Sequence, residues 1–189
     1  MKLIVGITGA SGAILGVRIL EGLRALHVET HLVMSRWARA TITQETSLTP
    51  ERVEQLATVV HAVDNQAAPI SSGSFKTDGM IVAPCSMKTL AAIRAGYSDS
   101  LLSRAADVVL KERRKLVLLV RESPLSEIHL ENMLSLTRMG AVIFPPVPAF
   151  YNSPQTVADI VTHIAGRALD QFGLQLPGVK RWDGQISRK

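Results

Sequence analysis

Short apolar runs alternate along the chain with longer segments in which apolar residues recur at helical spacing. The runs are rich in Val, Ile and Leu and have the length of strands, so we expect strands there. These strands are expected at residues 3–8, 29–34, 79–83, 115–120 and 140–144. The segments between them predict helices at residues 13–26, 36–44, 87–94, 101–113 and 126–138. A last helix is expected after Pro154, with one apolar face made by Val157, Ile160, Val161, Ile164, Ala168 and Leu169.

This alternation of strand and helix predicts an α/β fold. Consecutive parallel strands need helical crossovers, which cover both faces of the sheet and give a three-layer, Rossmann-like sandwich with a mostly parallel sheet. Ligands of such sheets bind at the carboxyl ends of the strands, near the point where the strand order reverses. With no internal repeat and no Gly- or Pro-rich linker, we expect a single domain over residues 1–189 that ends in an extended tail from about residue 173.

Composition bears on the cellular compartment in which the protein is expected. The chain is 47% hydrophobic, but no apolar run approaches the ~20 residues that a membrane span requires. The start of the sequence also lacks the apolar region and cleavage site of a signal peptide. Cys85 is the single cysteine, so no internal disulfide can form and a cytoplasmic location is expected.

The chain has a net charge of +5, from 21 basic and 16 acidic residues. Lys180, Arg181, Arg188 and Lys189 carry much of this excess. Because no long basic run is interleaved with aromatic residues, nucleic acid is not an expected partner.

The loop at Gly9–Gly12 joins the first predicted strand to the first helix. Backbone N–H groups at a helix N-terminus favour an anion, so a phosphate-bearing ligand is indicated. The glycine spacing differs from the G-x-G-x-x-G pattern of dinucleotide binders, and no acidic residue follows the second strand. FMN therefore fits best, although Arg36 leaves an NADP enzyme as an alternative. Ser11 is expected both to cap the helix and to contact the ligand.

Two later strand ends carry similar polar residues. Ser35, Ser86 and Thr89 can cap helices or face the flavin, and both interpretations are compatible. Cys85 is interpreted as a buried small residue rather than a nucleophile. The five histidines have no metal-ligand spacing, so no metal site is expected.

Several cations indicate a second anionic site. Arg104 and Lys111 are seven residues apart, which returns them to nearly the same helix face, although a solvated charged stripe paired with Asp107 is the alternative. Arg121, Tyr151 and Arg167 follow at or beyond later strand ends, and together such groups could clamp a phosphate. Two carboxylates near these cations, Glu45 and Glu122, are candidates for acid–base work or for plain ion pairing.

Sequence motifs along nearly the whole chain resemble those of the UbiX-type flavin prenyltransferases. The matching segments are residues 6–13 (GITGASGA), 71–75 (SSGSF), 84–89 (PCSMKT), 104–113 (RAADVVLKER), 121–124 (RESP), 128–133 (IHLENM), 148–151 (PAFY) and 181–182 (RW). The resemblance implies a flavodoxin-like fold and a metal-independent transferase. That enzyme joins a dimethylallyl group from dimethylallyl phosphate to N5 and C6 of reduced FMN. It also implies that the prenylated FMN serves a UbiD-type decarboxylase of aromatic acids, and that the chain assembles as a homo-oligomer, often a dodecamer.

By position, the resemblance assigns residue roles. Those expected at FMN are Gly9, Ala10, Ser11, Ser35, Ser86, Met87, Lys88, Thr89 and Arg121. Those expected at the prenyl phosphate are Arg104, Lys111, Arg121, Tyr151 and Arg167, and the catalytic residues are Ser11, Glu45 and Glu122. The alternatives are an FMN-binding accessory subunit of a decarboxylase and a flavin-dependent cysteine decarboxylase-like enzyme.

Overall fold

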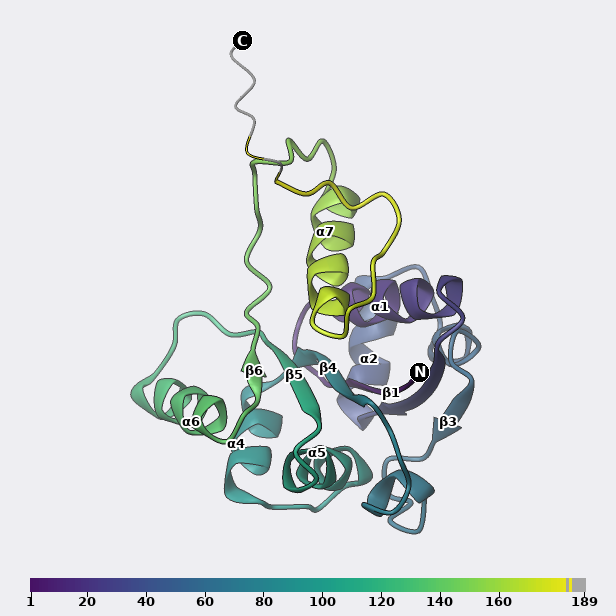
Figure 1. Cartoon of the computed structure of the whole chain (residues 1–189), viewed down its shortest axis with the longest axis vertical. Coiled ribbons are helices and arrows are strands. Elements are labelled where there is room, and N and C mark those ends of the chain that lie inside the picture. The colour runs from purple at the N-terminus through teal and green to yellow at the C-terminus, as the bar shows by residue number, and fades with distance from the viewer. Residues whose placement is uncertain (183, 185–189) are drawn as a thin grey trace.

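A parallel sheet forms the middle layer of the computed structural model, which describes residues 1–182 and 184 (Figure 1). Within these residues the sheet has six strands in the order β3-β2-β1-β4-β5-β6, and every neighbouring pair is parallel. The strands are β1 (Lys2–Ile7), β2 (Glu29–Met34), β3 (Val59–His61), β4 (Gly79–Cys85), β5 (Lys115–Val120) and β6 (Val142–Ile143).

The sheet confirms the predicted α/β class. The five expected strands alone have the spatial order 2-1-3-4-5 of flavodoxin-like folds, and β3 adds a short strand beyond β2 to give the Rossmann order. The strand order reverses between β1 and β4, so the predicted ligand site lies at the carboxyl ends of these two strands.

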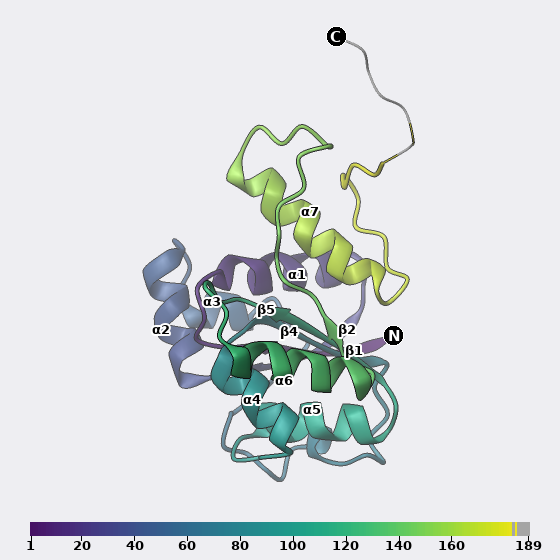
Figure 2. The same cartoon turned by 90° about the vertical axis from the view of Figure 1, so that its left-hand side faces the viewer.

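Helices cover both faces of the sheet, as Figure 2 shows most plainly. Helices α1 and α7 lie on one face, and α4, α5 and α6 lie on the other (Figures 1 and 2). The helices are α1 (Ala13–Ala25), α2 (Arg36–Glu45), α3 (Pro50–Glu54), α4 (Met87–Ala95), α5 (Leu101–Lys111), α6 (Glu127–Arg138) and α7 (Val157–Asp170), with a 3-10 turn at Pro69–Ser71.

The sheet separates two apolar cores. Leu3, Val5 and Ile7 of β1 are wholly buried on the α1 and α7 side, whereas Ile4 belongs to the core beneath α4 and α5. This alternation follows from the two-residue period of a strand. At roughly 2 kcal/mol for each large side chain removed from water, the two cores are the main stabilising contribution to the fold.

The segment after β6 leaves the body of the sheet and returns as α7, which packs along α1 (Figures 1 and 2). The expected tail then turns back over α7: Leu176 is buried, and Val179 lies against Gly166. Residues 183 and 185–189 of this tail, including Arg188 and Lys189, lie outside the described residues. In the described part of the chain, no helix is long and apolar enough to cross a membrane.

Candidate functional site

A cavity of about 470 Å³ opens at the carboxyl ends of β1 and β4. Its walls come from the loop after β1 and from the first turns of α2, α4 and α5. The volume lies within the range typical of small-molecule sites. Its lining includes Thr8, Gly9, Ser35, Arg36, Trp37, Ser86, Lys88, Thr89, Ser100 and Ser103.

Three helix N-termini converge on this cavity, each capped by a serine. Ser35 Oγ accepts a hydrogen bond from the N–H of Ala38 at 3.1 Å, and Ser86 Oγ accepts one from the N–H of Thr89 at 3.3 Å. Ser100 caps α5 in the same way. The predicted caps at Ser35 and Ser86 are therefore confirmed, and the three helix dipoles all favour an anion in the cavity.

The loops around the cavity also present backbone donors. Ser86 N–H donates to Thr8 Oγ at 2.8 Å, and the Thr8 hydroxyl donates to the Pro84 carbonyl at 2.7 Å, which ties the two loops together. Within residues 1–182 and 184, the N–H groups of residues 9–11 and 87–88 have no protein acceptor. Unpaired donors, hydroxyls and the cations of Arg36 and Lys88 form a donor set that suits FMN, whose phosphate is the strongest acceptor of the molecule.

At the N-terminus of α1 we expected the phosphate of a ligand and a cap by Ser11. In the structure, a carboxylate of the protein itself occupies this place. Glu45 Oε2 accepts hydrogen bonds from Gly12 N–H at 2.7 Å and from Ala13 N–H at 3.1 Å. Gly12 is the N-cap, with φ of 98°, a conformation that favours glycine. The prediction that Ser11 caps this helix is therefore wrong. A carboxylate from the end of α2 takes that role.

Glu45, Ser11 and Arg121 lie together at this place. Partial burial raises the pKa of the Glu45 carboxyl, but hydrogen bonds from the Ser11 hydroxyl and from the N–H groups of Gly12 and Ala13 lower it, as does the charge of Arg121. The net effect places the pKa of Glu45 below its usual value of 4.5, so this side chain is a carboxylate at neutral pH.

Glu122 follows Arg121 on the exposed loop after β5. Its carboxylate accepts a hydrogen bond from Ser123 N–H at 3.0 Å, and its residue is exposed. Within the described residues, Glu122 makes no hydrogen bond or ion pair with Ser11 or Glu45, the other two predicted catalytic residues.

Arg104 and Lys111 lie along the same side of α5, as predicted, beside the segment at residues 71–73. Arg104 Nε donates to the Ser71 carbonyl at 3.1 Å, and its guanidinium pairs with Asp107 at 2.6 Å. Lys111 pairs with Glu112. The ion-pair interpretation therefore describes these two cations within the isolated chain.

Tyr151 and Arg167 line a second cavity of about 550 Å³, next to α7. Arg181 and Trp182 line it too, so this part of the tail contributes to the cavity. Asp170 joins the two arginines: it lies 2.8 Å from Arg167 and accepts two hydrogen bonds from Arg181, at 2.7 and 2.6 Å.

The two pairs of predicted phosphate-binding residues do not meet within one chain. Arg104 and Lys111 belong to α5, on one face of the sheet, whereas Arg167 belongs to α7, on the other (Figures 1 and 2). The chain by itself thus builds two separate cationic groups rather than a single clamp.

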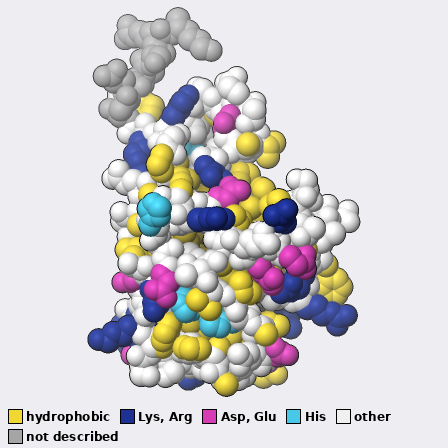
Figure 3. Space-filling view, turned by 90° about the vertical axis from the view of Figure 1, so that its right-hand side faces the viewer, with side chains coloured by type: hydrophobic (Ala, Val, Ile, Leu, Met, Phe, Trp, Pro, Cys, Tyr) yellow, Lys and Arg dark blue, Asp and Glu magenta, His cyan; other side chains and the backbone are white. Residues whose placement is uncertain are grey.

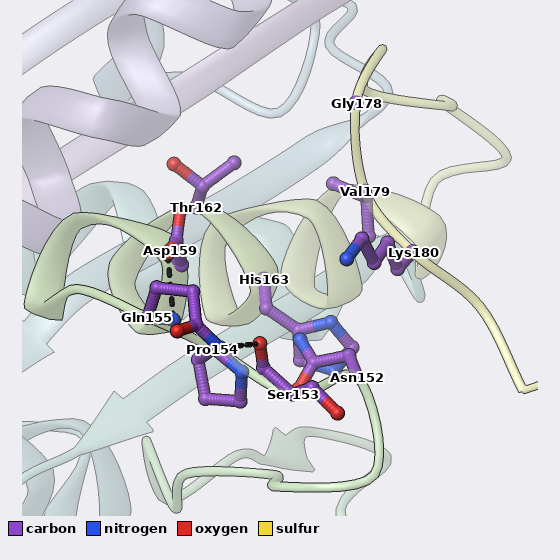
Figure 4. A pocket seen from close by; sticks show the side chains of 10 residues that line it. All are labelled: Asn152, Ser153, Pro154, Gln155, Asp159, Thr162, His163, Gly178, Val179 and Lys180. Carbon is purple, nitrogen blue, oxygen red and sulfur yellow. Dashed lines mark hydrogen bonds between the residues drawn. The ribbon is translucent and has the colours of Figure 1, made fainter.

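His163 contacts Tyr151 and lines both the second cavity and a smaller one of about 290 Å³. Figure 4 shows His163 among the residues of the smaller cavity. Nε2 of His163 lies 3.3 Å from the Tyr151 hydroxyl, and the two rings meet edge to face. Burial, with the charge of Arg167, lowers the pKa of His163. Sequence reasoning missed His163 and Asp170, and also Trp37 in the first cavity. The spacing of Asp170 from Arg167, three residues along a helix, was an available signal.

The remaining residues that could carry chemistry are the cysteine, the metal-ligating side chains and the surface charges. Cys85 is fully buried, as expected, and burial raises the pKa of its thiol to about 12. Among the described residues, no three His, Cys, Asp or Glu side chains gather into a group that could hold a metal ion. On the face drawn in Figure 3, Lys and Arg side chains are interspersed with Asp and Glu rather than gathered into one basic patch.

Comparison with known proteins places this geometry in a family. The Flavoprotein family model matches residues 1–169. A Bacillus subtilis protein described as a probable UbiX-like flavin prenyltransferase is 64% identical over 189 residues, covering 100% of this chain and 93% of that protein.

Two solved structures agree closely with the fold. AnUbiX (PadA1) in complex with FMN and dimethylallyl pyrophosphate has a TM-score of 0.97 at 58% identity, covering 98% of both chains. A dodecameric FMN-dependent UbiX-like decarboxylase from Escherichia coli O157:H7 has a TM-score of 0.96 at 65% identity, covering 97% of this chain and 100% of the other. The chain therefore belongs to the Flavoprotein family and, within it, to the UbiX-like flavin prenyltransferases.

Proposed function

We propose that this protein is a flavin prenyltransferase that transfers a dimethylallyl group from dimethylallyl phosphate to N5 and C6 of reduced FMN. The observation that carries the proposal is the match over 98% of both chains with AnUbiX, whose structure holds FMN and dimethylallyl pyrophosphate. The cavity at β1 and β4 supports it independently, because its unpaired donors suit a flavin phosphate.

The cavity residues are proposed to bind and orient the flavin. Ser35, Ser86 and Thr89 present hydroxyls at the N-termini of α2 and α4, and residues 9–11 and 87–88 present free N–H groups. Reduced FMN supplies the nucleophilic ring atoms when it is bound. Arg121 is proposed to lie at the flavin as well, because its charge acts on Glu45 next to the first loop.

The acid–base roles are proposed from the charge state of Glu45 and from the position of Glu122 beside Arg121. Breaking the carbon–oxygen bond of the prenyl donor leaves negative charge on phosphate, which fixed cations stabilise. Closing the ring at C6 forms a carbon–carbon bond at the expense of the prenyl double bond: one proton is added to that double bond and one is taken from C6, so a base must accept the ring proton. Glu45 is an ionised carboxylate and is assigned as that base, with Ser11 as its hydrogen-bond partner, whereas Glu122 is assigned as the proton donor to phosphate.

The phosphate clamp is proposed to form between subunits. Arg104 and Lys111 of one copy would meet Tyr151 and Arg167 of another, because one chain holds these pairs on opposite faces of its sheet. The dodecameric relative supports such an assembly.

Mixed assemblies test this arrangement directly. Lys111→Ala and Tyr151→Phe are each expected to be nearly inactive alone. Co-assembled at random, they should recover about a quarter of the sites, because one kind of interface then holds both intact residues. No recovery in assemblies shown to contain both variants would place the clamp within one chain.

The transfer itself is tested anaerobically, with reduced FMN and dimethylallyl monophosphate or diphosphate, followed by mass analysis of the flavin. A gain of one C5H8 unit is expected. Bound FMN with no gain from either donor would instead favour the accessory-subunit alternative, and release of carbon dioxide from a cysteine-ended peptide would favour the decarboxylase alternative.

Glu45→Gln is expected to keep FMN bound and to stop product formation. Unchanged turnover would remove Glu45 from the mechanism. We further propose that the product passes to a UbiD-type decarboxylase of aromatic acids in the cytoplasm, a compartment that suits the single reduced cysteine.

A further inference from the structure

Trp37 is the aromatic residue that lines the first cavity, and its side chain has no place in the core. It is the second residue of α2 and is 73% exposed, although tryptophan is among the largest apolar side chains. Among the described residues, it has no aromatic partner and no cation above its ring. An indole left open beside a ligand cavity indicates a surface that the ligand completes.

The backbone beneath Trp37 is fixed against the first loop. A Cβ atom added at Gly9 would lie only 2.3 Å from Cβ of Trp37, so the loop after β1 and the first turn of α2 can approach this closely only because residue 9 is glycine. The Trp37 carbonyl also accepts a hydrogen bond from the Thr41 hydroxyl at 2.8 Å. The indole therefore projects from a rigid base next to the free donors of residues 9–11.

The other walls of the cavity have a polar part and an apolar part. Hydroxyls, helix N-termini and charged side chains supply the polar part, and the charged side chains are those of Arg36, Lys88 and Asp99. Val63, Ala92 and Leu102 supply apolar surface beside them. FMN has the same two-part character, because it carries a charged phosphate at one end and a flat aromatic ring system at the other. An indole face is suited to the ring system, by stacking and by burial of apolar area.

We propose that Trp37 is a positioning residue for the flavin: its indole packs on the isoalloxazine ring and fixes the orientation of the ring within the cavity. This inference rests on the proposed function only in taking FMN as the occupant of the cavity. It assigns to α2 a contribution that is separate from the cap at Ser35, since the cap serves the anionic end and Trp37 serves the ring.

The chain offers a control in Tyr97, an exposed aromatic residue after α4 that lines none of the three cavities described above. Oxidised FMN is titrated into the full-length protein and into W37F, W37A and Y97F, with the Kd measured by calorimetry and the emission of bound flavin by fluorescence. A stacked indole quenches flavin emission by electron transfer, and phenylalanine does not.

The expected results distinguish loss of the stacking contact from a general loss of folded structure. W37A should raise the Kd for FMN about two- to tenfold, the range of an aromatic contact, whereas W37F should stay within about twofold of the native protein. Emission of bound FMN should rise in both Trp37 variants and remain quenched in Y97F. Circular dichroism and light scattering establish that each variant folds and assembles.

Two outcomes overturn the inference. Emission of bound FMN that is the same in W37F as in the native protein, with an unchanged Kd in W37A, would show that the indole does not touch the flavin. A smaller assembly in W37A with unchanged emission in W37F would assign Trp37 to a subunit contact. If the native protein itself does not bind FMN, the proposed function fails and not this inference alone.

Discussion

Glu45→Gln tests the finding that a side chain, not a ligand, provides the anion at the N-terminus of α1. The substitution keeps an oxygen that can accept the N–H groups of Gly12 and Ala13, which lie 2.7 and 3.1 Å away, but it removes the charge. Charged acceptors contribute about 1 kcal/mol more than neutral ones, and the helix dipole adds roughly 0.3–1 kcal/mol. Because Glu45 is an exposed residue, solvent screening reduces the sum, and we expect a net loss of about 1 kcal/mol.

For a chain of this length, that loss lowers the Tm by about 2–4 °C, measured by differential scanning calorimetry at pH 7. The pKa of Glu45 is lowered in the folded state, so its stabilisation is complete above the ordinary value of 4.5 and is lost as the pH falls through the folded value. The difference between the native protein and the variant should therefore shrink below about pH 4.5, as followed by urea unfolding at several pH values.

A control separates this effect from a general change of charge. Glu131→Gln removes an exposed carboxylate of α6 that has no hydrogen bond or ion pair within the described residues, and it should leave the Tm within about 1 °C. The reasoning is refuted if Glu45→Gln melts with the native protein at pH 7. A difference that persists undiminished at low pH would refute it equally.

Three further predictions follow from the packing. Gly16→Ala should cost about 1–3 kcal/mol in urea unfolding, because its Cβ would lie 2.4 Å from the Ala83 carbonyl oxygen; native-like stability would contradict the close packing of α1 on β4. Burial, with the charge of His31, lowers the pKa of His61, so stability should fall as the pH drops below about 6.5, and His61→Gln should flatten that dependence. The thiol of Cys85, with a pKa of about 12, should resist a disulfide reagent at pH 8 until the protein unfolds; rapid native-state labelling would contradict its burial.

The central strands could be predicted from sequence because burial on both faces leaves a strong apolar signal. Strands β1, β2, β4 and β5 are almost wholly buried, and their predicted bounds agree with the structure to within two residues. In contrast, β3 has three residues, none of them fully buried, and α3 has five. Elements this short have too few positions for a period to be visible, so only tertiary contact defines them.

The cap of α1 shows a second limit of local reasoning. Ser35 and Ser86 cap the helices that directly follow them, and the rule that predicts them needs only neighbouring residues. At α1 the same rule selects Ser11, but Glu45 reaches the helix from 33 residues away along the chain. Parallel pairing of β1 and β2 brings the loop after β1 and the start of α2 to the same edge of the sheet. Helix α2 then packs against α1, which places its last residue, Glu45, at the start of α1.

The positions of the cations could also be predicted only in part, because sequence spacing describes one helix and not its place in the fold. Sequence spacing correctly places Arg104 and Lys111 on one side of a helix, because seven residues are close to two turns. It carries no information on which face of the sheet that helix covers. The packed sheet lies between α5 and α7, and close-packed cores do not yield enough to let Arg104 approach Arg167. A single phosphate held by both groups therefore requires two copies of the chain, which makes assembly a condition of the proposed chemistry rather than an addition to it.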